Sequence, residues 1–296
     1  FALNEEDNLD DTSTGLHYLQ EKQTTQDSTN GPILEVRNLS KIFITPSSLL
    51  KAKQLFTAVK DVNFTVRRGE TVGIVGESGS GKSTIGRMIL GLEDITEGSV
   101  IYRGKDLKLI TDTNERRAHC LSMQCIFQDP YSSLNPRMTA GENITYGLRV
   151  HKMISSGDAK SLAQELMALV GLPREDAEKL PHAFSGGERQ RIGIARALSY
   201  RPDFIFCDEP TSALDVSVQA NLLNLLKDLQ EKFSLTLLFV SHDLAVIRQM
   251  CDRVIVMKEG EALESDSNDN IFEHPKHQYT RSLLDAMPKF KGLAPT

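Results

Sequence analysis

The sequence predicts an α/β fold in which a mixed, mainly parallel sheet is covered by helices and interrupted by an inserted helical subdomain. A short apolar run at 71–75 leads through a glycine-rich loop into a helical stretch at 82–90. Strand patterns return at 204–207 and 235–240, separated by a long amphipathic helix. Between these parts, at 131–200, helical periodicity replaces the strand pattern. Strands that alternate with helices form parallel sheets with helices on both faces.

The first elements are two strands and then the loop and its helix. Apolar and polar residues alternate over 33–38 and again over 62–66, which is typical of half-buried strands. A Ser- and Lys-containing insert at 46–56 separates them. The helix at 82–90 is expected to stop at Gly91, because glycine commonly ends helices.

The later elements are helices, two strands and a hairpin. Leucines recur on one face of a helix that ends at Gly171, and again along the helix between the last two apolar strands. The first set is Leu162, Leu166 and Leu169, and the second is Leu222, Leu225, Leu226 and Leu229. Residues 253–263 predict a hairpin that turns at Glu259 and Gly260, and a polar, helical extension follows it.

Charge is unevenly spread along the chain. Residues 1–30 contain seven acidic residues and one lysine, so the net charge of −6 arises there and the remainder balances. Such an acidic, polar segment is typical of a disordered linker. The balanced remainder gives no basic face, so no nucleic-acid partner is expected. No run approaches the roughly 18 apolar residues of a membrane-spanning helix, so work on a membrane is expected from its surface.

The cysteines are expected to be free thiols. Cys120, Cys125, Cys207 and Cys251 lie far apart without C-x-x-C spacing. A metal site at Cys120 and Cys125 is the alternative, but no partner at zinc-like spacing supports it.

The glycine-rich loop is the strongest chemical signal. It fits G-x-x-x-x-G-K-[ST], and its glycines let backbone N–H groups surround phosphates at the positive end of the following helix. Lys82 is expected on the β- and γ-phosphates, Ser83 on Mg²⁺, and Thr84 near the α-phosphate. The alternative is a surface turn, which the preceding strand disfavours. The residues assigned to the nucleotide are Gly76, Glu77, Ser78, Gly79, Ser80, Gly81, Lys82, Ser83 and Thr84.

Two acids follow the apolar strand at 204–207. Ligands of open α/β sheets lie at the carboxyl ends of strands, so Asp208 is expected to hold Mg²⁺ through water. Glu209, one residue further, is the candidate for polarising an attacking water. An ordinary strand end with solvated carboxylates is the alternative, and only the phosphate loop argues against it.

Gln128 and His242 each follow an apolar strand. The amide of Gln128 suits Mg²⁺ or the attacking water, although a glutamine at a strand end is usually just solvated. His242 is at a strand end from which a γ-phosphate is within reach, although a lone histidine there is more often a cap.

A second anion site is predicted where Ser185, Gly186 and Gly187 begin a helix. A plain serine N-cap is the alternative. One nucleotide does not need two phosphate cradles on one subunit, whereas two subunits that face each other do.

Taken together, these motifs resemble an ATP-binding cassette (ABC) ATPase subunit over about 33–263. GESGSGKST resembles the Walker A motif of that family, Gln128 its Q-loop, FSGGERQ its signature and FIFCDE its Walker B motif. The segment 212–215, which ends in Asp215, resembles its D-loop, and His242 its switch histidine. The resemblance implies a P-loop NTPase core of the ABC type.

Roles for further residues follow from the resemblance. Phe43 resembles the adenine-stacking position, although a packed Phe is an equally plain interpretation. Ser185 and Gly187 would face the γ-phosphate of a partner, and Phe184 and Glu188 depart from the usual Leu and Gln. Glu209, His242 and Gln128 would be catalytic, and Ser83, Gln128 and Asp208 would serve Mg²⁺.

The resemblance also divides the chain into parts. It implies an acidic linker at 1–31, an ATP-binding core at 32–130 and 200–265, a helical subdomain at 131–199 and a C-terminal extension at 266–296. The segments FQDPYSSLNPRMT and IFEHPKHQYTRSLLDAMP resemble the oligopeptide, dipeptide and nickel importer branch. Because no cysteine follows Cys251, no C-terminal iron–sulfur cluster is expected. The first residue, Phe, indicates a trimmed chain or the second half of a fused two-cassette subunit.

The implied function is ATP hydrolysis that powers import of peptides, glutathione, nickel or another small solute. The implied cofactors are ATP and Mg²⁺, and the implied site of action is the cytoplasmic face of the bacterial inner membrane. Implied partners are a second cassette, two membrane permease subunits and, indirectly, an extracytoplasmic solute-binding protein. The alternatives are a soluble ABC ATPase acting on ribosomes or DNA repair and an unrelated P-loop kinase or GTPase.

Overall fold

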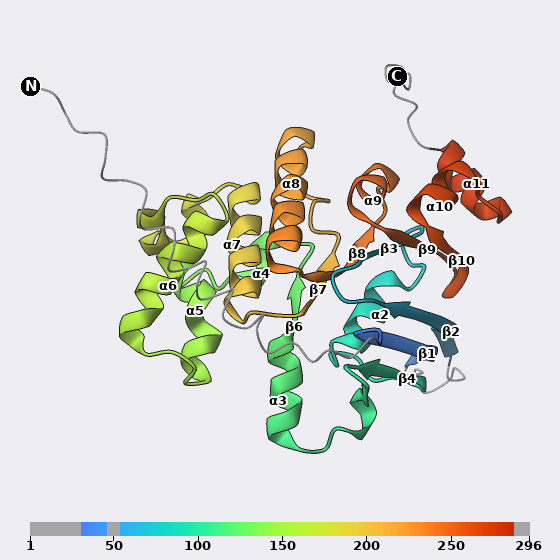
Figure 1. Ribbon diagram of the computed structural model, residues 1–296, viewed down its shortest axis with the longest axis horizontal. Coiled ribbons are helices and arrows are strands. Elements are labelled where there is room, and N and C mark those ends of the chain that lie inside the picture. The colour runs from blue at the N-terminus through green and yellow to red at the C-terminus, as the bar shows by residue number, and fades with distance from the viewer. Residues whose placement is uncertain (1–30, 46–53, 287–296) are drawn as a thin grey trace, which may run out of the picture. The chain divides into compact units, whose positions relative to one another are not determined.

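The computed structural model describes residues 31–45 and 54–286, and the chain divides into two compact units (Figure 1). Unit 1 includes Ile110–Leu237, and unit 2 includes Pro32–Leu109 and the chain from Leu238 onward. The acidic linker expected at 1–31 lies, except for Gly31, outside the described residues. The division into core, helical subdomain and extension stays a prediction.

Unit 2 contains an antiparallel sheet with the strand order β2-β1-β4-β5. Its strands are β1 (Leu34–Thr45), β2 (Gln54–Val66), β4 (Glu97–Tyr102) and β5 (Lys105–Asp106). The sequence predicted the first two, but the insert expected at 46–56 was drawn too long, because 54–56 already belong to β2. The two shorter strands were not predicted. The short 3₁₀ helix η2 (Leu107–Leu109) follows them.

The second sheet of unit 2 carries the phosphate loop. Strand β3 (Thr71–Val75), buried along its whole length, pairs in parallel with β9 (Arg253–Lys258), which pairs antiparallel with β10 (Glu261–Ser267). Strand β8 (Thr236–Ser241) lies next to β3, and the boundary between the units falls within it. The α/β class with a mixed, mainly parallel sheet is therefore confirmed.

Helices cover this sheet because its faces are apolar. Helix α2 (Lys82–Ile89) follows β3, and Gly91, with φ 68°, lies just beyond its end as predicted. Helix α9 (Leu244–Met250) packs so closely on β3 that a Cβ at Gly73 would lie 2.8 Å from Cys251 Sγ. Burial raises the pKa of this thiol.

The C-terminal hairpin forms as predicted, and two helices follow it within the part of the extension that the structure describes, up to residue 286. The turn between β9 and β10 uses Glu259 and Gly260 with φ of 48° and 86°, the left-handed conformation of a type I′ hairpin. Helices α10 (Asn268–Glu273) and α11 (Gln278–Asp285) then follow β10.

Unit 1 contains a parallel strand pair and most of the helices. Strands β6 (Met123–Ile126) and β7 (Phe204–Asp208) pair in parallel, and Phe127 lies just beyond the first of them. The helices are α3 (Thr113–Ser122), α4 (Pro130–Ser133), α5 (Ala140–Val150), α6 (Ser156–Leu169), α7 (Gly186–Ser199) and α8 (Val216–Phe233), with 3₁₀ turns η3 (Arg174–Glu178) and η4 (Pro181–Ala183).

The helical stretch expected at 131–200 is confirmed, and α5, α6 and α7 pack on one another. Leu162 and Leu166 are buried in α6, whereas Leu169 is only half-buried. In α8 the buried face contains Leu223 and not Leu225, so the sequence misassigned one of its four leucines.

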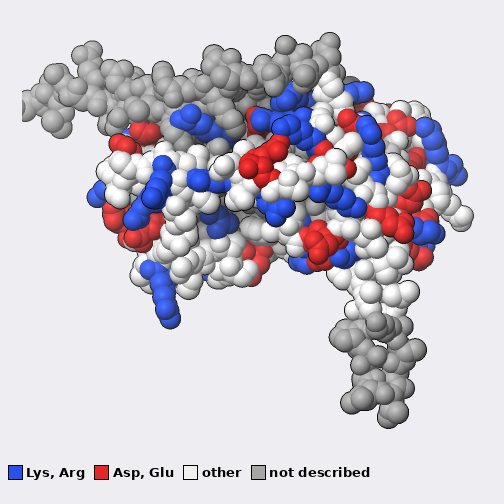
Figure 2. Space-filling view, turned by 90° about the horizontal axis from the view of Figure 1, so that it is seen from below, with Lys and Arg blue, Asp and Glu red and all other residues white. Residues whose placement is uncertain are grey.

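Charges of both signs are interspersed on the face of the molecule that Figure 2 shows. The cysteines are all free, as expected. Within the described parts of the chain, no helix has both the length and the apolar character needed to cross a bilayer.

Candidate functional site

The phosphate loop of unit 2 is built around glycines that no other residue could replace without strain. Gly76, Gly79 and Gly81 have φ of 154°, 83° and 99°. A Cβ at Gly76 would lie 2.2 Å from the backbone oxygen of Met257, and one at Gly81 would lie 2.4 Å from that of Ala58. The loop therefore packs closely against the backbone of β9 at Met257 and of β2 at Ala58.

The same loop offers positive charge and backbone donors to an anion. The N-cap of α2 is Gly81, which has no side chain to cap the helix, and the first turn carries Lys82, Ser83 and Thr84 instead of an acid. The first N–H groups of a helix lack intrahelical partners and carry a partial positive charge. An anion at this point therefore receives several donors at once, which fits a nucleotide phosphate.

Lys82 is buried and turned onto the loop itself. Its Nζ donates to the backbone oxygens of Gly76 and Glu77, each at 2.8 Å, and lies 3.5 Å from Ser80 Oγ. The side chain of Ser80 is also buried, whereas Glu77, Ser78 and Gly79 are exposed at the tip of the loop. The ammonium group of Lys82 therefore lies within the loop, where phosphates are expected to bind.

Two further predicted residues belong to unit 2. Phe43 lies on β1 opposite Phe56 of β2, with 37% of its surface exposed, and Lys41 Nζ lies 4.8 Å from its ring centroid. An exposed aromatic ring can stack on a base. His242 is exposed directly after β8, and Asp243, the next residue, caps α9 by accepting from Ala245 N–H at 2.8 Å.

In unit 1 the structure brings two predicted catalytic residues together. Glu209 follows β7 with φ 46°, a left-handed conformation that is unusual for a non-glycine residue. Gln128 Nε2 donates to Glu209 Oε2 at 3.3 Å, so the amide orients that carboxylate. Asp208 is the last residue of β7 and is half-buried.

The motif Ser185–Gly187, called here the SGG motif, begins α7 with a capping box. Ser185 Oγ accepts from Glu188 N–H at 3.4 Å, and Glu188 Oε2 accepts from Ser185 N–H and Oγ–H, each at 2.8 Å. The N–H of Ser185 and then its hydroxyl lower the pKa of Glu188. A Cβ at Gly187 would lie 2.3 Å from Val218 Cγ1, so the motif packs tightly against the start of α8.

Asp215 is the N-cap of α8. Its carboxylate accepts from Val218 N–H at 3.0 Å and from Ser217 Oγ at 2.8 Å, and these hydrogen bonds lower its pKa. The next residue, Val216, is 84% exposed, so an apolar side chain stands in solvent beside the cap.

Sequence reasoning missed two contacts to these motifs. Gln190, on α7, donates from Nε2 to the backbone oxygen of Phe127 at 3.0 Å and so ties the SGG helix to the residue before Gln128. Tyr279, on α11, accepts from Glu77 N–H at 3.4 Å. No local pattern marks either residue, because each contact joins distant parts of the chain.

The predicted residues thus fall into two sets. Unit 2 holds the phosphate loop, Phe43 and His242, and unit 1 holds Gln128, the SGG motif, Asp208, Glu209 and Asp215. Over 31–45 and 54–286, no group of three or more His, Cys, Asp or Glu side chains could hold a metal ion.

Comparison with known proteins gives one consistent result. The family model described as "ABC transporter" matches residues 59–212, more than half of the chain. The chain is 47% identical over 260 residues to a Brucella ovis protein named as a peptide import ATP-binding protein, covering 88% of this chain and 80% of that one. It is 46% identical over 257 residues to the oligopeptide transport ATP-binding protein OppF of Bacillus subtilis, covering 86% of this chain and 82% of OppF.

A solved structure is also similar. The ATP-binding cassette MJ0796, a dimer in a post-hydrolysis state bound to ADP and Pi, matches with a TM-score of 0.69 at 32% identity. The match covers 79% of this chain and 98% of that one.

Proposed function

Because the chain belongs to the ABC transporter family, we propose that it is the ATP-hydrolysing subunit of an importer for peptides or a related small solute. ABC cassettes are ATPases, and this chain is one of them. The relatives named for peptide and oligopeptide transport support the cargo class, and glutathione and nickel are further candidates.

The observation that supports this proposal is that one chain has two glycine-bearing helix N-termini that suit an anion, at the phosphate loop and at the SGG motif. The phosphate loop offers glycine N–H groups and Lys82, and the SGG motif offers the N-terminus of α7. We assign the loop to the chain's own ATP and the SGG motif to the ATP of a second cassette. The dimeric, ADP-bound cassette MJ0796 supports this arrangement.

Each remaining residue has a proposed role in phosphoryl transfer. Catalysis of this kind depends on positioning and on stabilisation of charge. Glu209 polarises the attacking water, and the amide of Gln128 orients the Glu209 carboxylate. His242 reaches the γ-phosphate. Phe43 stacks on the adenine, and Asp215 contributes to nucleotide binding.

Mg²⁺ suits the oxygen donors that the chain offers. It is usually held by one or two protein oxygens together with substrate phosphates, which fits Ser83, Asp208 and Gln128. When bound, Mg²⁺ would neutralise charge on the β- and γ-phosphates.

The proposed partners are a second cassette and two permease subunits at the cytoplasmic face of the bacterial inner membrane, with a solute-binding protein acting indirectly. We assign contact with the permease subunits to residues 131–147, where Tyr131 on α4 and Tyr146 on α5 are 63% and 51% exposed. A soluble ABC ATPase working without membrane subunits would not copurify with integral membrane proteins, which separates that alternative from the importer.

Glu209→Gln tests the catalytic assignment. The amide keeps the size of the side chain but cannot polarise water, so turnover should fall about 100-fold or more while ATP binding persists. The variant should accumulate as an ATP-bound dimer in size-exclusion chromatography with Mg²⁺ and ATP. Glu231→Gln, an exposed acid on α8, is the matched control and should behave as wild type. Steady turnover of Glu209→Gln near the wild-type rate would refute the role of Glu209.

A further inference from the structure

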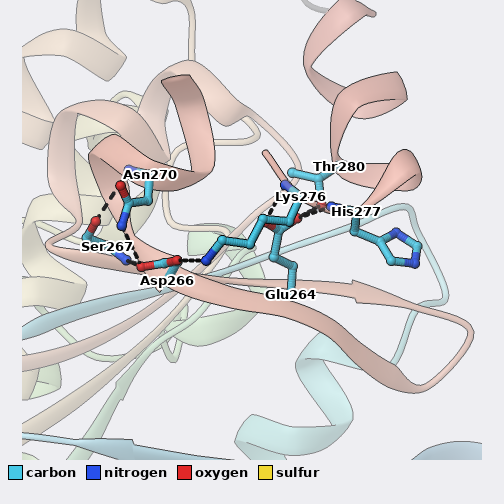
Figure 3. Close-up of polar contacts among 7 residues, drawn as sticks. All are labelled: Glu264, Asp266, Ser267, Asn270, Lys276, His277 and Thr280. Atoms are coloured by element: carbon cyan, nitrogen blue, oxygen red, sulfur yellow. Dashed lines mark hydrogen bonds and ion pairs between the residues drawn. The ribbon is translucent and has the colours of Figure 1, made fainter. Parts of the chain in front are cut away.

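The C-terminal helices of unit 2 are fixed to β10 by a network of charged hydrogen bonds (Figure 3). Glu264 accepts from the N–H groups of Lys276 and His277, at 2.8 and 3.1 Å, and from Thr280 Oγ1 at 2.5 Å. Thr280 is itself buried, with 1% of its surface exposed. The first turn of α11 therefore has one defined position on the strand.

A second acid on the same strand holds the linker between the helices. Asp266 accepts from Lys276 Nζ at 2.6 Å and from Asn270 Nδ2 and Ser267 N–H at 2.8 Å each. These contacts, with that of Asn270 first, hold the pKa of Asp266 well below its usual range. Asp266 thus holds the start of α10 and the linker, and Glu264 holds the start of α11. Figure 3 shows both acids along one strand.

The anchored segment brings Tyr279 to the phosphate loop. Its Oη accepts from Glu77 N–H at 3.4 Å, and Lys258 Nζ, at the end of β9, lies 4.9 Å from its ring centroid. Burial raises the pKa of Tyr279, so the hydroxyl is neutral at physiological pH. At 3.4 Å this bond is slightly longer than the usual 2.7–3.2 Å of an N–H···O hydrogen bond.

The contact falls on the peptide that also holds Lys82. The N–H of Glu77 and the carbonyl of Gly76 belong to one peptide group, and Lys82 Nζ donates to that carbonyl at 2.8 Å. Tyr279 therefore binds the N–H of this peptide group, and Lys82 binds its carbonyl oxygen. Hydrogen bonds in such a chain polarise one another, so each bond strengthens the other.

We propose that Tyr279 is a positioning residue of the phosphate loop, through which the C-terminal helices fix the Gly76–Glu77 peptide for ATP binding. This inference rests on the proposed function and adds a role for the C-terminal extension that ATP hydrolysis itself does not require. Without the hydroxyl the loop samples more conformations, and ATP binding must bear the cost of ordering it.

Tyr279→Phe tests the proposal, because it removes one oxygen and keeps the ring over Lys258. A hydrogen bond of this kind contributes about 0.5–1.5 kcal/mol, which corresponds to a rise of roughly 2- to 10-fold in the KM for ATP and in the Kd measured with Glu209→Gln as background. The kcat should stay within about twofold of wild type, because Tyr279 does not touch the reacting atoms. Tyr200→Phe, which makes the same change at the C-cap of α7, a residue with no assigned role, is the matched control and should change neither value.

A spectroscopic measurement reports on the same contact. The chain contains six tyrosines and no tryptophan, so its intrinsic emission comes from tyrosine. Addition of Mg²⁺ and ATP should change the tyrosine emission of wild type and of Tyr200→Phe, and this change should be smaller in Tyr279→Phe. Equal ATP affinity and equal emission changes in a folded Tyr279→Phe protein would overturn the proposal while leaving the ATPase assignment intact. Wild-type protein that fails to bind ATP would overturn both.

Discussion

At the scale of single residues, the departure of the SGG motif from its usual sequence has a physical consequence. Glu188 already binds the N–H and the hydroxyl of Ser185, the groups that we assign to a partner's γ-phosphate. The lowered pKa of Glu188 means that this carboxylate is charged at neutral pH. It therefore competes with the phosphate for the same donors and repels it.

Glu188→Gln should tighten the ATP-dependent dimer. The amide preserves the capping box but removes the negative charge, so we expect a roughly 2- to 5-fold lower dimer Kd in Glu209→Gln background, with a smaller gain at high salt. Glu188→Ala also removes the cap and serves as the contrasting variant, with lower stability of α7. Analytical ultracentrifugation with ATP measures both, and a weaker dimer for Glu188→Gln at unchanged stability would contradict the competition.

At the scale of elements, the loop that follows β3 was predictable, whereas β4 and α3 were not. The strand and α2 were located to within a residue, because burial and glycine conformation determine both. Strand β4 buries only two side chains, Val100 and Tyr102. Helix α3 buries only Ser122, so neither has the apolar periodicity that sequence analysis detects.

The chemistry of the site was readable from the sequence, but its couplings were not. Gln128, Asp208 and Glu209 were assigned from strand ends together with the phosphate loop and the resemblance to family motifs. The contacts of Gln190 with Phe127 and of Tyr279 with Glu77 join residues 63 and 202 positions apart. Such contacts depend on tertiary packing, and a single sequence carries no local signal for them.

The C-terminal element offers a test with a defined pH dependence. Burial raises the pKa of Glu264, but hydrogen bonds from Thr280, Lys276 and His277 outweigh this effect, and the pKa is lowered overall. A lowered pKa means that the charged form stabilises the docked segment. Its contribution is complete above the ordinary value of about 4.5 and is lost as the pH falls through the lower, folded value.

Glu264→Gln should therefore loosen α11 at neutral pH. The side-chain NH₂ of the substituted residue would face the N–H and O–H groups that donate to Glu264 in wild type. We therefore expect about 3- to 10-fold faster hydrogen exchange of the backbone amides over 278–285. In wild type the same loosening should appear only at acidic pH. Glu273→Gln, whose partner Arg248 lies 3.9 Å away in an exposed pair, is the control. Exchange in Glu264→Gln that matches wild type at neutral pH would show that this network does not hold the helix.

At the scale of the whole molecule, charge and architecture agree with the assignment. The net charge of −6 arises in residues 1–30, and the face that Figure 2 shows mixes charges of both signs. We assign anion binding to the phosphate loop and the SGG motif. Two copies, or this chain and a related one, would bring each loop to the SGG motif of the other.

The most direct test of this central claim mixes two inactive variants. Lys82→Ala disables the loop, and Gly186→Asp places an acid at the SGG motif, where a Cβ meets only Leu214 Cδ2 at an ordinary 3.6 Å, so the fold should tolerate it. A mixed dimer combines both defects in one composite site and leaves the other site intact. ATPase activity of an equal mixture should recover to about a quarter of wild type, since half of the dimers would carry one intact site. Activity no higher than the mean of the two separate variants would contradict a nucleotide shared between two chains.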